Sequence, residues 1–533
     1  MSAVPIAPIA PIASIAPRVS GWQQAAWLAL YDLKSLWRER GPLWLLLVAV
    51  VLALLALAQG ASFHSRVQVA TQAAQAQELA ARGSAAALAQ TYFANPADPQ
   101  FTELKWWRSP VDIRGYAFRE HLSFAVQPAL PGAALAVGQA DVLPAYVRVR
   151  AESMEGAASA YEIEHPARLA VGRFDLMFFV IYLWPLALLA LGSSVLTQER
   201  EARRLPGLHL QGVASWRLLL AQVLTRTLGA TAVLLLTVVA AALIAGIVPA
   251  TGEGAGAGAR ALATWSGIVV LYTLFWAGVV AVVCSLCAQR VTAAFAGFGA
   301  WVLLTVLAPA LLTAGVSLAA PVPSRELYID ALRDAGDRVS SNRVQMLERF
   351  YDQHPQWRPV KTALDKLPGA VTRLARAQEQ ERLLANVSGR FEAARTQRDT
   401  LFARWSWLSP VTLASVALAR TAGTDAQRHR VFMAEAQAHH QRLRDFFQAG
   451  IQQAALRDEQ APCPVTCRGG YGFEDFDAVP TFSASPALLQ ATPFGAGAIA
   501  IAAWALALLA LAVWRVAAPR APAVSHPYQP STP

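Results

Sequence analysis

The chain has 533 residues, of which 55% are hydrophobic and only 15% are charged, and its formal net charge is +10. Because the apolar residues gather in uninterrupted blocks, the composition argues against a single soluble core and for several membrane crossings. The positive charge does not indicate a nucleic-acid partner, since arginines mixed with Glu, Gln and Ala on long helical stretches are typical of a solvated surface and no recognition motif accompanies them.

Residues 1–42 are predicted to form a cytoplasmic tail followed by a helix at the membrane surface. A Pro-Ile-Ala repeat occupies residues 5–13, and no basic residue precedes Arg18, so the charged start of a signal peptide is missing. Residues 21–40 then mix tryptophan and leucine with lysine and arginine, a composition typical of an interfacial helix that contacts membrane lipid.

Six apolar segments have about the 20 residues that a helix needs to cross a hydrocarbon layer of about 30 Å. They predict an all-α polytopic membrane protein with about six transmembrane helices. The predicted spans are residues 43–58, 174–196, 218–248, 265–286, 293–319 and 494–516. Arg226 falls within the third span, and we expect its long side chain to reach the headgroups rather than stay at mid-bilayer.

Basic residues in the short connections orient the predicted spans, because such residues stay on the cytoplasmic side. They are Lys34, Arg38 and Arg40 before the first span, Arg200, Arg203, Arg204 and Arg217 after the second, Arg290 after the fourth, and Arg515 and Arg520 at the end of the sixth. Both termini, including the tail 517–533, are therefore expected in the cytoplasm of a bacterial inner membrane.

Two long segments, 59–173 and 321–493, then lie on the outer, periplasmic side as separate domains. In the first, residues 146–150 and 161–164 alternate apolar with polar side chains, which favours short strands. We therefore expect a small α/β or mixed fold for the first outer domain.

The second outer domain is expected to be mainly helical. An apolar stripe follows a charged helix over residues 370–407. Ser409 followed by Pro410 is a helix-start pattern, and Thr424 with Gln427 has the spacing of a capping box before the next helix. An antiparallel helical hairpin follows from these signals.

The sequence contains no pattern of a known catalytic or metal site. The phosphate-binding loop GxxxxGK[ST], the zinc motif HExxH and the nucleophile motif GxSxG are all missing, so we expect neither an enzyme nor a cofactor in this chain. His439 and His440, adjacent on a charged helix, are interpreted as surface residues. Ionisable residues are scarce in the predicted spans, which disfavours a proton-coupled carrier, and Asp175 is interpreted as an interfacial carboxylate.

The four cysteines form two close pairs. Cys463 and Cys467 lie in the second outer domain, where an oxidising environment favours a short disulfide loop, although free thiols or a metal site stay open. Cys284 and Cys287 end the fourth predicted span and are expected to be buried, reduced thiols.

The connection 197–217 crowds charged and apolar residues into a short cytoplasmic loop. It contains Glu199, Arg200, Glu201, Arg203, Arg204, Leu205, Leu208, Leu210, Val213 and Trp216. From the residues alone, this loop is either an anchor that lies on the lipid headgroups or a helix that docks on another protein.

Several short motifs, in order along the chain, resemble those of permease subunits of ATP-binding cassette (ABC) transporters of type 2, in the subgroup with large outer insertions after the first and fifth spans. The motifs lie at residues 136–141 with Pro144, 172–175, 199–201, 323–325, 408–410, 423–425 and 428–429. The likeness covers nearly the whole chain, from the interfacial helix to the last span.

The resemblance implies that residues 199–201 end the second transmembrane helix and that residues 205–216 dock into a groove of a separate ATPase subunit. That subunit would bind ATP and Mg, and a second permease copy or paralogue would complete the transporter. At residues 203–205 the chain has Arg-Arg-Leu where the family commonly has Gly-Thr-Leu, and Gly212 stands where a proline is common. These departures are consistent with the non-equivalent half of a heterodimer.

The sequence thus predicts a permease subunit whose transport is driven by ATP hydrolysed on another chain. The first alternative is a non-transporting membrane anchor or scaffold that presents an outer interaction domain, and it predicts no ATPase partner. The second is a membrane-anchored enzyme, which would require clustered acid, base or metal-ligating residues in an outer domain.

Overall fold

The computed structural model describes residues 21–102, 105–109, 111–152, 154, 174–249, 254–460, 471–491 and 495–517. Within them, six helical segments are long and apolar enough to cross a membrane: Arg40–Ala94, Leu176–Glu201, Ser215–Ile244, Ala255–Leu286, Arg290–Ala319 and Gly495–Ala517. Each predicted span lies in or overlaps one of them. The chain is therefore a multi-pass and mainly α-helical membrane protein.

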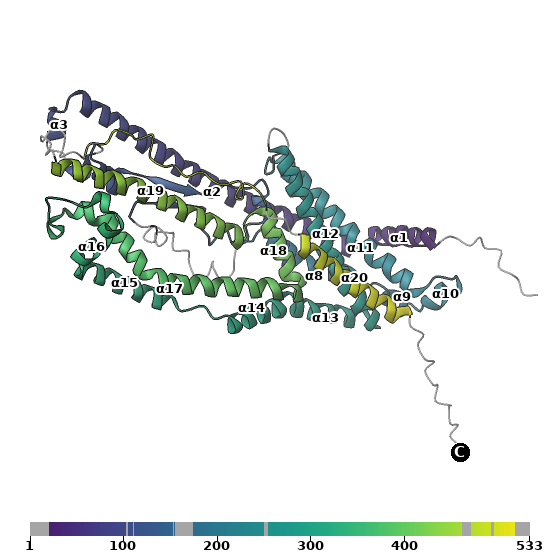
Figure 1. The fold of residues 1–533 in the computed structure, drawn as a ribbon. Helices are drawn as coiled ribbons and strands as arrows, with labels where there is room; N and C mark the ends of the chain where they lie inside the picture. The colour runs from purple at the N-terminus through teal and green to yellow at the C-terminus, as the bar shows by residue number, and fades with distance from the viewer. Residues whose placement is uncertain are drawn as a thin grey trace, which may run out of the picture.

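The molecule is elongated, with a membrane bundle at one end and a distal domain at the other (Figure 1). The bundle contains α8 (Trp184–Gly192), α11 (Ser215–Ile244), α12 (Ala255–Leu286), α13 (Arg290–Trp301), α14 (Ala308–Ala319) and α20 (Gly495–Ala517). The distal domain contains α3 (Pro99–Thr102), α15 (Arg325–Ser341), α16 (Arg343–Gln353), α17 (Gly369–Trp405) and α19 (Ala426–Gln460). The short helix α18 (Pro410–Ala422) joins the two, and α1 (Gly21–Arg38) lies against the bundle.

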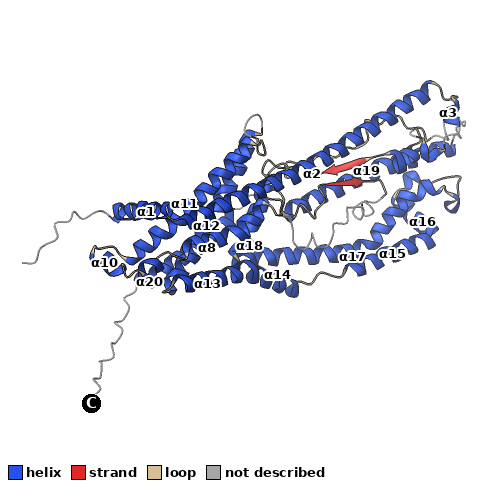
Figure 2. Ribbon diagram, turned by 180° about the vertical axis from the view of Figure 1, so that it is seen from behind, coloured by secondary structure: helices blue, strands red, loops and turns tan. Residues whose placement is uncertain are grey.

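Helix α2 (Arg40–Ala94) belongs to both parts, because it is 55 residues long and continues well beyond the expected end of the first span at residue 58 (Figure 2). At 1.5 Å per residue this helix is roughly 80 Å long. No proline interrupts it after Pro42. It ends at Ala94, and Asn95 leaves the helical conformation because Pro96 follows it. The distal domain is thus attached to the first span without a hinge.

The distal domain contains a two-stranded antiparallel sheet that packs between α2 and α19 (Figure 2). β1 (Ser123–Val126) pairs with β2 (Tyr146–Val149), with Ser123 opposite Val149. The strand predicted at 146–150 is confirmed, whereas the one predicted at 161–164 lies outside the described residues.

The helix starts predicted in the second long segment are confirmed in one case and wrong in the other. The Ser409 hydroxyl caps α18 by accepting the Thr412 N–H. At α19, however, the Asp425 carboxylate accepts the Arg428 N–H, while the Thr424 N–H and hydroxyl both donate to the Ala419 carbonyl. Thr424 therefore belongs to the end of α18, where the chain turns at the left-handed Gly423, and the cap of α19 is Asp425, one residue later than expected.

Asp175 ties the start of the second span to a loop of the distal side. Its carboxylate accepts the N–H groups of Phe178, Val137 and Gly138, at 2.7, 2.7 and 3.3 Å. The side chain is buried, so this carboxylate is a structural clamp and not simply an interfacial charge. Asp175 and the pair Val137 and Gly138 belong to two of the motifs that carry the family resemblance, 172–175 and 136–141.

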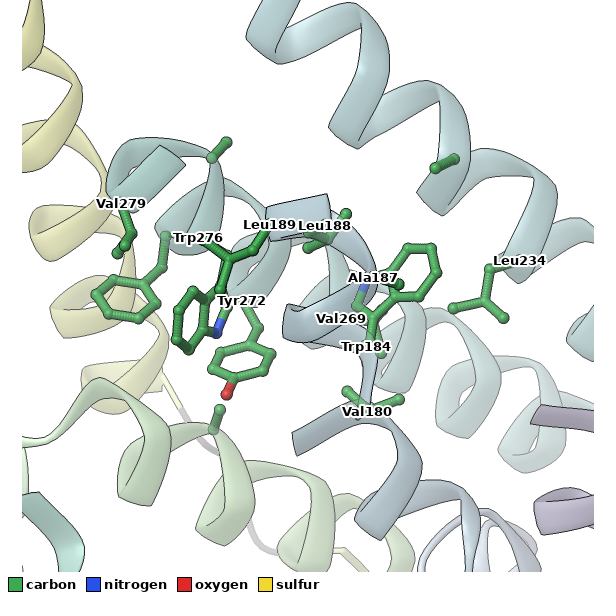
Figure 3. Close-up of a cluster of buried hydrophobic side chains, with 14 of the residues drawn as sticks. Val180, Trp184, Ala187, Leu188, Leu189, Leu234, Val269, Tyr272, Trp276 and Val279 are labelled. Carbon is green, nitrogen blue, oxygen red and sulfur yellow. The ribbon is translucent and has the colours of Figure 1, made fainter. Parts of the chain in front are cut away.

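The core of the bundle is built around α12, which packs against α8, α11, α13, α18 and α20. Figure 3 shows Trp184, Tyr272 and Trp276 in this core, and all three side chains are fully buried. Pro185 cannot donate to the carbonyl of Ile181, four residues earlier, and the Tyr272 hydroxyl donates to that carbonyl instead, at 3.1 Å. The Tyr272 hydroxyl of α12 thus replaces the backbone N–H that Pro185 does not have.

The interpretation of His439 and His440 as surface residues is wrong. Both side chains are fully buried, because their face of α19 packs against the sheet. His439 Nε2 lies 2.9 Å from Ser123 Oγ, and His440 Nδ1 lies 2.8 Å from the Arg150 carbonyl oxygen. Burial lowers the pKa of His439 to about 4, and burial with the nearby Arg82 lowers the pKa of His121 to about 3.

We expect the distal domain to lose stability as the pH falls from 6.5 towards 4. In this window both histidines bind a proton in the unfolded chain, whereas His121 and His439 stay neutral in the folded protein because they are buried. Each of them therefore lowers the free energy of unfolding by ~1.4 kcal/mol per pH unit. Amide hydrogen exchange in α19 and β2, compared at about pH 7 and about pH 5, measures the loss after correction for the intrinsic rate. His439→Gln should flatten the dependence, whereas the exposed His209→Gln should leave it unchanged; equal slopes in all three proteins would contradict the assignment.

Candidate functional site

The connection 197–217 lies at the end of the bundle opposite the distal domain, near α1 and the end of α20 (Figure 1). It folds into two short helices, α9 (Thr197–Glu201) and α10 (Leu205–Leu210). Leu196 and Arg203, which precede them, both have left-handed backbone angles, with φ of 59° and 54°. Such angles cost a non-glycine residue about 1–3 kcal/mol, so the surrounding contacts must hold the two turns in place.

The first turn is held from α11. The Leu196 N–H donates to Oε1 of Gln222, a buried glutamine of that helix, at 3.1 Å. The Thr197 hydroxyl donates to the Ser193 carbonyl at 2.9 Å. The end of the second span is thereby fixed to the third.

Arg200 fixes the same corner to the end of the fourth span. Its Nη1 donates to the carbonyls of Cys284 and Cys287, at 3.0 and 2.6 Å. These carbonyls end α12, where the last turn of a helix has no backbone donors and carries partial negative charge. The guanidinium is therefore a carboxyl-terminal cap for a helix that lies elsewhere in the sequence.

Glu201 makes the complementary contact with the start of the fifth span. Its Oε1 accepts the Arg290 N–H at 2.7 Å, where the first turn of α13 has unpaired donors. Glu199 pairs with Arg204 across the turn between α9 and α10, with Oε2 and Nε 2.9 Å apart. The predicted residues 199–201 thus bring together the ends of the second, fourth and fifth spans.

Helix α10 has two different faces. Leu205, Leu208 and Val213 are partly buried and pack against the bundle core. Leu210, by contrast, has 91% of its surface exposed, and the other exposed residues between 203 and 213 are Arg203, Arg204, Pro206, Gly207, His209, Gln211 and Gly212. Three of the apolar residues predicted to dock thus pack on the bundle, a difference between the two faces that the sequence analysis did not predict.

Two residues that sequence reasoning did not pair connect α1 to this corner. The expectation that Arg226 reaches the headgroups is wrong, since Arg226 and Asp32 are only 6% and 3% exposed and form a salt bridge. Arg226 Nη2 lies 2.7 Å from Asp32 Oδ1, and Nη1 donates to the Leu191 carbonyl and the Ser194 hydroxyl. The available signal was Asp32 itself, the one acidic residue of α1.

The cysteines give one confirmed and one open prediction. Cys284 and Cys287 are buried and free, as predicted for reduced thiols. Cys463 and Cys467 lie outside the described residues. Among the residues that are described, no group of three His, Cys, Asp or Glu is placed to hold a metal ion.

Comparison with known proteins identifies one segment. A family model described as a domain of unknown function (DUF3526) matches residues 325–460, which run from the start of α15 to the end of α19. No curated protein and no solved structure matches the chain.

Loss of one partner of the buried pair should destabilise the bundle strongly. Asp32→Asn leaves the Arg226 guanidinium buried without its counter-charge, which costs about 3–5 kcal/mol, and thermal unfolding in detergent measures it. The double variant Asp32→Leu with Arg226→Met should recover most of the loss, because both charges are then removed.

Lys34→Met, which removes an exposed charge from the same helix, is the matched control and should leave the unfolding temperature unchanged. If the double variant is as unstable as Asp32→Asn, the loss of stability does not come from an unpaired buried charge, and the prediction is wrong.

Proposed function

We propose that this chain is the transmembrane permease subunit of an ABC transporter in a bacterial inner membrane. In this proposal α9 and α10 lie in the cytoplasm and form the element that docks on a separate ATPase subunit. The main support is the corner at residues 199–201, whose side chains contact the ends of α12 and α13 directly. A protein that pressed on α10 would therefore act on several membrane helices at once.

Two features favour force transmission over a simple lipid anchor. The inner face of α10 is packed on the bundle through Leu205 and Leu208, and the turn before it is locked by the pair of Glu199 and Arg204. An anchor on the headgroups requires neither lock. The strained angles at Leu196 and Arg203 further indicate a defined shape, which a docking surface needs.

ATP would supply the bias between inward-open and outward-open arrangements, because a ligand shifts such an equilibrium only by its different affinity for the two states. ATP and Mg would bind to the partner ATPase. The chain itself would change the tilt of its helices as α10 moves, with Arg200 and Glu201 carrying the motion to the fourth and fifth spans.

A second permease copy or paralogue would complete the pathway. The fifth span is the natural candidate for that contact or for lipid, since its large apolar side chains, such as Phe295 and Leu311, are mostly exposed. The basic residues of the short connections support the orientation, and the distal domain with its matched segment 325–460 would then be periplasmic.

Within this proposal, the exposure of the side chains decides which residues we assign to the ATPase contact. Leu205, Leu208 and Val213 face the bundle, so we assign docking to the outer face of α10, centred on Leu210 and Pro206. Glu199, Arg200 and Glu201 would transmit the motion without touching the partner.

The test is co-purification of the chain with a candidate ABC ATPase in mild detergent, followed by ATP turnover. Leu210→Asp should reduce the bound ATPase by roughly tenfold or more, the factor that corresponds to about 1.4 kcal/mol. Glu201→Gln should keep the ATPase bound but lower turnover, because it weakens the link to α13. Val360→Asp, which adds the same charge at an exposed apolar residue of the distal domain, is the matched control.

No associated ATPase with the unaltered chain under any condition would remove the transporter proposal. The chain would then be better described as a membrane anchor that presents its distal domain to another envelope protein. Binding that survives Leu210→Asp but fails with Glu201→Gln would instead move the docking surface from α10 to α9.

A further inference from the structure

A partly open cavity lies where the bundle meets the distal domain. It is enclosed by α2, by residues 127–145 and by the turn between α18 and α19, and about 70 Å³ is open to the centre of a water molecule. Phe63, on its α2 wall, follows Leu43 by 20 residues, a rise of about 30 Å, which equals the hydrocarbon thickness. The cavity therefore lies at the membrane boundary on the side of the distal domain.

The cavity is amphipathic. Most of its lining is apolar, supplied by Phe63 and Val67 of α2 and by Leu130, Ala133 and Leu143 of the loop. Most of its polar groups lie at the turn into α19, namely Thr424, Asp425, Arg428 and His429, and the others are Gln127 of the loop and His64 of α2. A mainly apolar lining beside the membrane face of a helix, together with a cluster of polar groups, is suited to an amphiphile.

Three polar atoms in these lining side chains have no hydrogen-bond partner: Asp425 Oδ1, Arg428 Nε and His429 Nδ1. Asp425 and Arg428 are only 8% and 5% exposed, so these atoms do not form hydrogen bonds with bulk water. A buried polar atom left unpaired costs about 1–3 kcal/mol, and because all three side chains line the cavity, a group bound there is the natural candidate for their partner.

The side chains cannot turn away to solve this, because their other atoms are already used. Arg428 Nη1 donates to the Gly423 carbonyl at 3.0 Å, and Nη2 donates to the carbonyls of Pro128 and Leu488 at 2.5 and 2.6 Å. Asp425 Oδ2 accepts the Arg428 N–H at the start of α19. Nε–H and Oδ1 are thus fixed in place, one as a donor and the other as an acceptor.

The chemistry of the fixed pair selects an uncharged hydroxyl. A phosphate or carboxylate only accepts and would be repelled by Asp425, while an ammonium only donates and would be repelled by Arg428. A hydroxyl donates to Oδ1 and accepts from Nε–H at the same time. Burial, together with Arg395, lowers the pKa of His429, so its neutral ring adds no charge.

We propose that this cavity binds the uncharged, hydroxyl-bearing headgroup of an amphiphile whose acyl chain runs along α2. The size agrees, because 70 Å³ holds roughly five water-sized groups, about the number of heavy atoms in a glycerol head. The site does not depend on the proposed transport function, since a lipid bound here would serve a transporter and a scaffold alike.

The test uses the full chain in nanodiscs and a monoacylglycerol that carries a diazirine in its acyl chain. Illumination followed by peptide mass spectrometry should place the label on residues 50–63, the part of α2 that runs from the cavity into the membrane, or on residues 127–145. Unlabelled monoacylglycerol should compete roughly tenfold better than the methyl ester or the fatty acid of the same chain length, because these lack the uncharged hydroxyl. Free glycerol should compete poorly, because it lacks the chain.

Ala133→Trp fills the cavity from the loop and should reduce labelling by roughly tenfold, with Ala140→Trp as a second variant if the first does not fold. The control, Ala310→Trp, makes the same substitution at an exposed residue of α14 and should leave labelling unchanged. Undiminished labelling of these peptides in a folded cavity-filling variant, or the absence of label from both peptides, would overturn the proposal. Equal competition by the methyl ester would also overturn it, because the site would then not recognise the hydroxyl.

Discussion

The ends and breaks of helices leave backbone N–H and C=O groups without partners, and the architecture of this chain follows from the side chains of neighbouring helices that pair with these groups. Tyr272 serves the carbonyl that Pro185 leaves free, Arg200 serves the carbonyls that end α12, and Glu201 serves the first turn of α13. Each of these side chains lies on a different helix from the backbone group with which it pairs. The same contacts that satisfy the backbone therefore also lock the helices to one another.

This arrangement has a functional consequence at the corner of residues 199–201. A short polar segment that merely connected two spans would leave the other helices free to move independently. Here the segment holds the ends of three spans, and Asp32 with Arg226 brings α1 into the same assembly. Such a corner is suited to receive motion at α10 and to distribute it, which is what the proposed coupling to an ATPase requires.

The opposite side of the bundle is joined to the distal domain in a different way. α2 passes from the bundle to the distal domain without a break, and Asp175 connects the start of the second span to the loop at 137–138. Arg428 donates hydrogen bonds to carbonyls of three different segments. The proposed amphiphile site lies at this junction. A movement of the bundle and the binding of a ligand in the cavity are thus both expected to alter the contacts of the residues at this junction.

The lengths of the apolar segments in the sequence were enough to predict the membrane-spanning part of this protein. Six apolar segments long enough to cross a bilayer could be read directly, because crossing depends on local composition. The strand at β2, the long helix α17 and the cap at Ser409 were also local and were predicted. The importance of residues 199–201 followed from the resemblance to a family and from their unusual charge density.

Partners distant in sequence were decided only by the tertiary structure. Nothing local distinguishes an arginine that reaches headgroups from Arg226, whose counter-charge on Asp32 lies 194 residues away. Nor does a charged helix reveal that His439 and His440 face a sheet, or that Leu205 and Leu208 point inward while Leu210 points out. A residue's chemistry is written in the sequence, but whether that residue is buried, paired or exposed depends on which helix faces it, and that is settled by packing of the whole chain.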